Sequence, residues 1–417
     1  MFKCITLLVL LIVCDICLAK ISINFKNNAC NSYLAYFTKV VNKNCYYDDQ
    51  LFLETPQILD LRQLPYENHT VTTEDGYILT LFRATQKNPK GIIVMFHPII
   101  QDSTTWFLGG STSYGLTFIN QGYEVWFLNF RGVTYSDRHV KNLTGKEYWN
   151  WSFHELGYYD ISAVFRHVYS VTNQKAISFS MSIGSAAAAV YASERPDEAK
   201  KYVNLFIQLA TPAFLSDDTT VIRLIIPFIP IIKVFLKIFN IYSLPNRTFL
   251  IKFIINLVIF FNGEWLSTLV LPFLFGGGPF EMDPSRLPAG LAEYFQPSSV
   301  KTLLHFSQLI TNGNQFVQYD YGKSKNLDIY SSEKPPRYPL ESINVPVYLM
   351  YCDQDNLANP KGVEIFYQQL SDSVKPYGLV KFSGCGHADF IIGKTIPLLV
   401  QNSTLALLDK INQENNE

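Results

Sequence analysis

The stretch from Lys175 to Val190 constrains the fold more than any other part of the chain. A short apolar strand runs into a turn of small residues and then directly into an alanine-rich helix, with Ser182 at the tip of the turn. Such a turn exposes the serine hydroxyl, and the helix N-terminus behind it favours developing negative charge. The layout predicts a nucleophilic serine. The alternative is ordinary strand–helix packing, because Ser180-Met-Ser-Ile-Gly184 keeps only the second glycine of the usual Gly-x-Ser-x-Gly pattern.

Apolar runs of strand length on both sides of this turn alternate with helical patterns, which predicts an α/β fold with a mostly parallel central sheet. A hairpin is expected first, where two β-rich runs flank Glu74-Asp-Gly76. Helices are expected at about 160–169 and 361–370. The remaining predicted strands are 91–97, 123–129, 201–209, 345–351 and 377–382.

Two further polar residues follow predicted strands in the way that Ser182 does. Asp355 follows the strand at 345–351, and His387 follows the strand at 377–382. The chain order Ser, Asp, His is that of the α/β-hydrolase fold. We expect His387 to take the proton of Ser182, and Asp355 to orient the imidazole. Asp353 is the rival acid, but the apolar Leu357-Ala that follows Asp355 indicates a more sheltered place.

An oxyanion hole is expected from two backbone N–H groups. One belongs to Ile183, directly after the serine, and the other to Ile99, in the loop after the strand at 91–97. Pro98 has no N–H, but the donor that is needed lies one residue further on. His97 is an alternative base, although its place at a strand end favours a role in orienting the oxyanion loop. Asp389 is expected to be a supporting or turn residue.

The region from 216 to 300 differs in character from the sheet segments. Its runs at 221–239 and 249–261 are strongly apolar and helical in pattern, and prolines and basic residues interrupt the first. We expect the helices of a cap inserted in the sheet domain, with an apolar side toward the pocket or a lipid interface; a membrane span is the alternative. The predicted division is a signal peptide at 1–19, an N-terminal arm at 20–53, core at 54–215, a cap at 216–300 and core again at 301–417.

The first residues resemble a secretory leader, with Lys3 before an apolar run from Ile5 to Val13 and small residues up to Ala19. We expect cleavage before Lys20 and passage through the secretory pathway, to the outside of the cell or the lysosomal lumen; an uncleaved anchor is the alternative. N-glycosylation sequons agree with this route. They stand at Asn68, Asn142, Asn150, Asn246 and Asn402.

Removal of the leader would leave Cys30, Cys45, Cys352 and Cys385. An even number of cysteines in an oxidising compartment favours pairing. Cys30 with Cys45 would close a short N-terminal loop. Cys352 and Cys385 would lie close together if the polar residues that follow them converge on one site, and free buried thiols are the alternative.

Several segments in order resemble the acid lipase family of α/β-hydrolases, which includes gastric and lysosomal lipases, from about Glu54 to Asp409. They are Glu54-Thr-Pro, Val71 to Leu81, Gly122 to Trp126, Asn129 to Ser136, Tyr148 to Asp160, Ala192 to Pro196, Leu303 to Gln308 and Tyr319 to Gly322. The resemblance implies a secreted or lysosomal-type lipase with a cap over its pocket. It places the triad at Ser182, Asp355 and His387, and it implies no metal or organic cofactor.

The chain departs from that family at Ser180 and Pro98, where the family has glycine, and at Met181, where it has histidine. A β-carbon at 180 is expected to crowd the elbow, and Pro98 to restrict the oxyanion loop. The predicted function is hydrolysis of neutral lipid esters, triacylglycerol or cholesteryl ester, at a lipid interface. The alternative is a lipid-binding carrier whose chemistry is impaired. A net charge of -1 argues against nucleic-acid binding.

Overall fold

A central sheet of nine strands organises the protein in the computed structural model, which describes residues 27–215, 226–244, 264–278, 281–293 and 295–414. The strand order is β11-β10-β9-β8-β5-β6-β4-β3, and β7 pairs with β4. The six strands β5, β6, β8, β9, β10 and β11 are parallel to one another. The pairs β3–β4, β4–β6 and β4–β7 are antiparallel. The predicted α/β-hydrolase class is confirmed. The bounds are β3 Tyr66–Thr72, β4 Tyr77–Ala84, β5 Ile92–Phe96, β6 Glu124–Asn129, β7 Arg138–His139, β8 Ala176–Met181, β9 Val203–Leu209, β10 Val347–Cys352 and β11 Leu379–Phe382.

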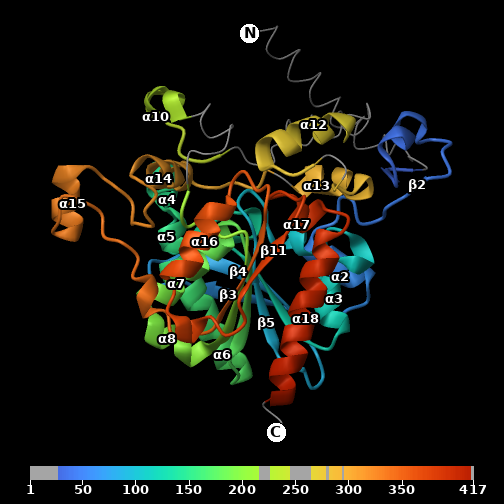
Figure 1. The fold of residues 1–417 in the computed structure, drawn as a ribbon, viewed down its shortest axis with the longest axis horizontal. Helices are drawn as coiled ribbons and strands as arrows, with labels where there is room; N and C mark the ends of the chain where they lie inside the picture. Colours follow the sequence, from blue (N-terminus) through green and yellow to red (C-terminus); the bar gives the residue numbers. More distant parts are fainter. Residues whose placement is uncertain (1–26, 216–225, 245–263, 279–280, 294, 415–417) are drawn as a thin grey trace.

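Helices cover both faces of the sheet (Figure 1). α6, α7 and α8 lie on one face, and α3 and α18 lie on the other. Strand β5 shows why its sequence is apolar throughout: Val94 and Phe96 pack on the α7 side, and Ile93 and Met95 pack on the α3 side. The bounds are α2 Thr55–Leu61, α3 Tyr114–Asn120, α4 Gly145–Tyr148, α5 Phe153–Glu155, α6 Ser162–Thr172, α7 Ile183–Glu194, α8 Pro196–Tyr202, α16 Pro360–Gln369, α17 Asp389–Ile392 and α18 Ile396–Glu414.

Several element boundaries differ from the sequence prediction: the strands predicted at 345–351 and 377–382 begin at Val347 and Leu379, and two further differences have a local cause. The helix predicted at 160–169 begins as α6 at Ser162, because a π-helix, Leu156–Ile161, precedes it. This π-helix packs tightly on α7, where a β-carbon added at Gly157 would stand 2.3 Å from the carbonyl oxygen of Ala187. The strand predicted from residue 201 begins at Val203, because α8, which starts at Pro196, continues to Tyr202. The predicted hairpin of β3 and β4 is confirmed.

Three of the segments that resemble acid lipases meet at the buried Arg131. Its guanidinium donates to Asp160 Oδ1 at 2.6 and 2.8 Å and to the Asp75 carboxylate at 2.6 and 2.9 Å, and it lies 3.8 Å from the centre of the Tyr77 ring. Removal of one partner from a buried ion pair costs about 3 to 5 kcal/mol. These segments therefore stabilise the fold beneath the site.

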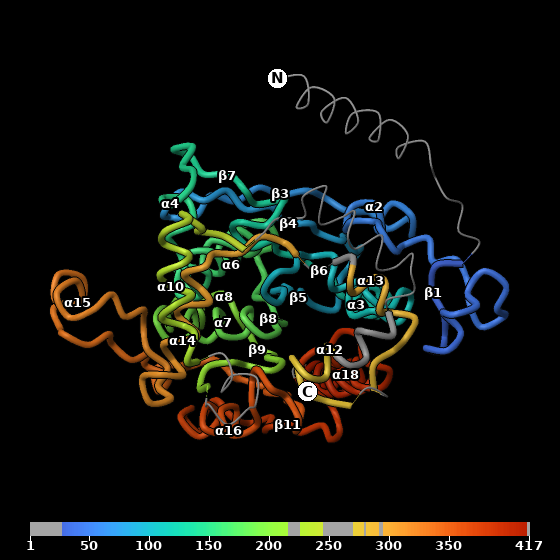
Figure 2. The backbone as a smooth tube through the Cα atoms, turned by 90° about the horizontal axis from the view of Figure 1, so that it is seen from above, coloured from blue at the N-terminus to red at the C-terminus, as the bar shows by residue number. Residues whose placement is uncertain are grey.

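Of the described helices between β9 and β10, α10, α12, α13 and α14 lie beyond the carboxyl ends of the parallel strands, whereas α15 projects to the side (Figure 1). Seen from above, α10 and α14 lie to one side, and α12 and α13 lie to the other (Figure 2). In the described part of the chain, no helix has both the length and the apolar character needed to cross a membrane. The apolar run at 249–261 and the signal peptide at 1–19 lie outside the described residues, and the domain division stays a prediction. The bounds are α10 Ile229–Ile238, α12 Glu264–Phe275, α13 Leu287–Glu293, α14 Val300–Thr311 and α15 Lys323–Tyr330.

Candidate active site

Ser182 stands on a sharp turn between β8 and α7, with φ 56° and ψ −121°. Few non-glycine residues adopt this conformation, which is typical of a nucleophile held at a strand–helix turn. The turn is fixed because the Ser182 N–H donates to the carbonyl of Leu209 at 2.9 Å. Gly184 is required here, since a β-carbon would stand 2.4 Å from the Phe96 carbonyl oxygen.

The structure brings Ser182, His387 and Asp355 together in one chain of hydrogen bonds. Ser182 Oγ lies 2.8 Å from His387 Nε2, and His387 Nδ1 lies 2.8 Å from Asp355 Oδ2. All three residues are buried. The carboxylate can only accept, so Nδ1 carries the proton and Nε2 is left to accept from the serine. This arrangement can activate a serine hydroxyl as a nucleophile.

The two rival acids occupy different places. The other oxygen of Asp355, Oδ1, accepts from the N–H groups of Leu357 and Ala358, both at 2.8 Å, which holds the buried carboxylate in position. Asp353 is half-buried, and its Oδ1 accepts from the Gly384 N–H at 2.8 Å. The geometry therefore favours Asp355 as the partner of the histidine.

A disulfide between Cys352 and Cys385 joins the loop of the acid to the loop of the histidine. Both cysteines are fully buried. The bond lies directly before the two polar residues and links the ends of β10 and β11. A second disulfide, between Cys30 and Cys45, lies in the N-terminal region.

The end of α12 packs on the same two loops, which the sequence analysis did not anticipate. The carbonyl of Phe275 accepts from the His387 N–H at 2.9 Å and from the Asn356 N–H at 3.2 Å. The approach is so close that a β-carbon at Gly276 would stand 1.7 Å from the Gln354 carbonyl oxygen. The run of three glycines from 276 to 278 was the available signal for this contact.

Both ring nitrogens of His97 form hydrogen bonds to the backbone around the predicted oxyanion loop. Its Nε2 accepts from the Phe130 N–H at 3.0 Å, so Nδ1 carries the proton and donates to the Pro98 carbonyl at 2.8 Å. Burial lowers the pKa of His97 to about 4, which keeps the ring neutral above that pH. Ile99 and Ile183, the predicted oxyanion donors, both line the cavity beside the serine, and their role as donors stays a prediction.

Ser180 is accommodated by hydrogen bonds. Its hydroxyl donates to the Ile207 carbonyl at 3.2 Å and lies 3.1 Å from Ser185 Oγ. Ser185 was missing from the sequence analysis, although its small side chain at the start of α7 was a signal for close packing. The hydroxyl at 180 is therefore hydrogen-bonded between β8 and β9.

Asp389 is fully buried, and its Oδ2 accepts from the Gly386 N–H at 2.7 Å. Burial, together with repulsion from Glu281 and Asp355, raises its pKa to about 7. The side chain thus stabilises the loop before His387, as expected of a supporting residue.

A cavity of about 480 Å³ opens at Ser182 beneath the described cap helices. Its wall is almost wholly apolar, which suits an acyl chain more than a polar substrate. The lining residues are Ile99, Ser182, Ile183, Pro212, Leu215, Ile226, Ile229, Ile232, Leu236, Leu244, Val300, Leu303, Leu304, Phe306, Ser307, Ile310 and Leu357.

The structure also bears on the predicted glycosylation sites and on possible metal sites. Asn68, Asn142, Asn150 and Asn402 are exposed, as glycan acceptors must be, whereas Asn246 lies outside the described residues. Within the described ranges, no group of three or more His, Cys, Asp or Glu residues is arranged to hold a metal ion.

Comparisons with known proteins point to esterases of lipids. Residues 55–110 match a family model described as a partial alpha/beta-hydrolase lipase region. Lipase member K of Homo sapiens is 28% identical over 86% of this chain and 91% of its own length. Lipase 1 of Drosophila melanogaster is 29% identical over 83% and 77%. Tear acid lipase-like protein of Mesocricetus auratus is 28% identical over 93% and 97%.

Proposed function

Because this chain belongs to the acid lipase-like α/β-hydrolases, we propose that it hydrolyses esters of neutral lipids, triacylglycerol or cholesteryl ester, with Ser182 as nucleophile. The observation that carries the proposal is the hydrogen-bonded chain Ser182–His387–Asp355 at the floor of an apolar cavity. The cavity supports a long acyl chain as the bound group.

The proposed reaction has two halves. Ser182 Oγ bonds to the ester carbonyl carbon while its proton passes to His387 Nε2, and the N–H groups of Ile99 and Ile183 stabilise the oxyanion. The C–O bond then breaks, and the imidazolium gives its proton to the leaving alcohol. Water attacks the acyl-enzyme by the same route, which releases the fatty acid and restores the serine. Asp355 keeps its charge and stabilises the imidazolium.

The proposed setting is the secretory pathway, with the mature protein outside the cell or in the lysosomal lumen. The leader-like N-terminus, the disulfides and the four exposed sequons support it.

Hydrolysis of emulsified triolein and cholesteryl oleate, from about pH 4 to about pH 8, tests the function with wild type beside Ser182→Ala. We expect wild type to release fatty acid and the variant to lose activity by about 10⁴-fold or more. Fluorophosphonate labelling is the companion assay, since it requires an activated serine. If folded wild type neither labels nor hydrolyses, the protein is a lipid carrier on this scaffold. Labelling of Ser182→Ala at the wild-type level would show that another serine is the nucleophile.

A further inference from the structure

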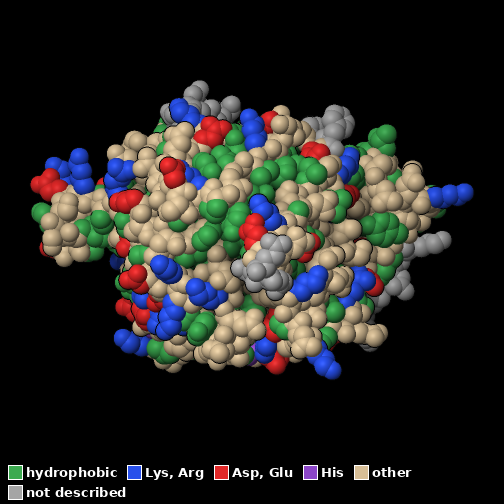
Figure 3. Space-filling view, turned by 60° about the horizontal axis from the view of Figure 1, so that its bottom comes forward, with side chains coloured by type: hydrophobic (Ala, Val, Ile, Leu, Met, Phe, Trp, Pro, Cys, Tyr) green, Lys and Arg blue, Asp and Glu red, His purple; other side chains and the backbone are tan. Residues whose placement is uncertain are grey.

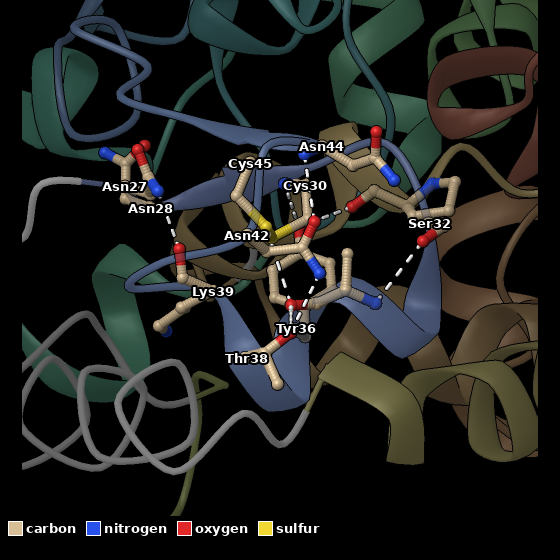
Figure 4. The surroundings of a disulfide bond; sticks show 12 residues. Asn27, Asn28, Cys30, Ser32, Tyr36, Thr38, Lys39, Asn42, Asn44 and Cys45 are labelled. Atoms are coloured by element: carbon tan, nitrogen blue, oxygen red, sulfur yellow. Dashed lines mark hydrogen bonds between the residues drawn. A yellow bond between two sulfur atoms is a disulfide. The ribbon is translucent and has the colours of Figure 1, made fainter.

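The N-terminal knob, residues 27–47, is a small unit with its own disulfide. Strand β1, Ala29–Cys30, pairs with β2, Cys45–Tyr46, and the 3₁₀ helix η1, Tyr33–Thr38, lies between them. Figure 4 shows the disulfide with Tyr36 beneath it and the surrounding amide side chains. Asn27 Nδ2 donates to the Lys39 carbonyl, and Asn42 Nδ2 to Thr38 Oγ1. These contacts give the knob a fixed shape despite its size.

Two tyrosines attach the knob to the cap. The hydroxyl of Tyr33 donates to the Met282 carbonyl at 3.1 Å, and that of Tyr36 donates to the Pro284 carbonyl at 2.7 Å. A 3₁₀ helix has three residues per turn, so side chains three apart share a row. With Tyr33 and Tyr36 in the row toward the cap, Leu34 and Phe37 form a neighbouring row.

That neighbouring row faces solvent. Leu34 is 79% exposed and Phe37 61%, and in the turn after η1 Val40 is 62% exposed and Val41 82%. These four apolar side chains, close together on one small disulfide-bonded unit, form an exposed patch of a kind that is uncommon on protein surfaces facing water. Of the two lysines in the stretch 27–47, Lys43 is exposed and Lys39 is buried, and Asp48 and Asp49 follow directly, so the patch is apolar and carries no excess of positive charge.

The knob contacts a cap helix that also carries exposed apolar side chains and whose end contacts the triad. η1 contacts α12, whose Val270 and Phe273 are also exposed. In Figures 1 and 2 the knob lies beside α12 and α13, on the side of the molecule that holds the cap. The carbonyl of Phe275, at the end of α12, accepts from the His387 N–H. The opposite face shows hydrophobic side chains interspersed with acidic and basic ones (Figure 3).

We propose that the N-terminal knob inserts Leu34, Phe37, Val40 and Val41 into a lipid surface, and so holds the cap side against it. This rests on the proposed function, whose substrate is found at such a surface. Separate protruding side chains enter a lipid layer without a complementary partner, whereas a stable protein dimer needs about 1,200 Å² or more of matched area. A lipid surface therefore fits this patch better than a second copy of the chain.

The test is partition of the full chain to vesicles of phosphatidylcholine, in a Ser182→Ala background so that turnover plays no part. We expect L34S/F37S to lower the partition coefficient by about tenfold or more. The matched control is L327S/I329S, which changes two exposed apolar residues on α15, away from the knob, and leaves partition unchanged.

The knob changes made in otherwise wild-type protein should leave hydrolysis of soluble p-nitrophenyl butyrate and the thermal midpoint unchanged. Wild-type partition by L34S/F37S would overturn the proposal, as would a wild-type dimer that this variant converts to a monomer without loss of vesicle binding. Failure of the proposed function is a separate result: wild type would then not hydrolyse the soluble ester, whatever the vesicles show.

Discussion

Ser180 stands where the resembled family has glycine, at a crowded point of the elbow. Its hydroxyl is accommodated because it donates a hydrogen bond to the Ile207 carbonyl of β9. Ser178 is a natural comparison, because it is buried in the same strand and, among the described residues, its hydroxyl has no hydrogen-bond partner. Ser180→Ala should lower the free energy of unfolding by about 1 kcal/mol, and Ser178→Ala should leave it unchanged or raise it. Urea unfolding at neutral pH measures both. Equal effects of the two substitutions would show that the contact to β9 contributes nothing.

His97 should make stability depend on pH. Its pKa is lowered by burial from the ordinary 6.5 to about 4, so the unfolded chain binds a proton in this range and the folded protein does not. The neutral ring therefore contributes its stability in full above about pH 6.5, and that contribution is lost as the pH falls through about 4. The shift corresponds to about 3 kcal/mol.

His97→Asn removes this titration, and the difference from wild type should shrink as the pH falls from about 7 to about 4 in urea unfolding. Asp389, whose raised pKa acts in the opposite direction, is present in both proteins and cancels from the difference. A constant difference across that range would contradict the assignment.

At the scale of elements, the end of α12 is a support for the catalytic loops. The Phe275 carbonyl holds the backbone of His387, and Gly276, with φ +79°, allows the approach to Gln354. A displacement of about 1 Å at a catalytic group can cost about a hundredfold in rate. Gly276→Ala should therefore lower kcat on p-nitrophenyl butyrate by about a hundredfold, with little change in KM.

Gly278→Ala is the matched control, because nothing in the described part of the chain lies within 4 Å of a β-carbon placed there. Steady-state kinetics of the two variants, with fluorophosphonate labelling rates, check the prediction. If Gly276→Ala keeps the wild-type kcat, α12 does not position the histidine.

For the whole molecule, sheet and cap helices together enclose a cavity of about 480 Å³ that neither would form alone. Leu304 of α14 lines it opposite the elbow side chains. Leu304→Trp fills part of the space, so hydrolysis of trioleoyl esters should fall by about tenfold or more while butyrate esters are still cleaved. Comparison of kcat/KM for the two esters measures the change. An equal loss on both esters would mean that the acyl chain lies elsewhere.

The sequence by itself determined the fold class and the place of the elbow. Strand length, apolar runs and small residues around Ser182 are local properties, and alternation of strands with helices leaves few topologies for a parallel sheet. The chain order of Ser182, Asp355 and His387 follows from the same pattern, since each follows a sheet strand. Their assigned roles in the reaction remain predictions.

Only the tertiary structure decided which side chains meet. Whether Asp353 or Asp355 points to the histidine depends on the backbone direction after β10, which no local pattern encodes. The contact of α12 with His387, the hydrogen bonds of Ser180, and the attachment of the knob to Met282 and Pro284 all join residues far apart in the chain. Such contacts form only when the packing of helices on the sheet brings the ends of these elements together. Hydrogen-bond geometry tolerates errors of only a few tenths of an ångström, so no local sequence pattern determines it.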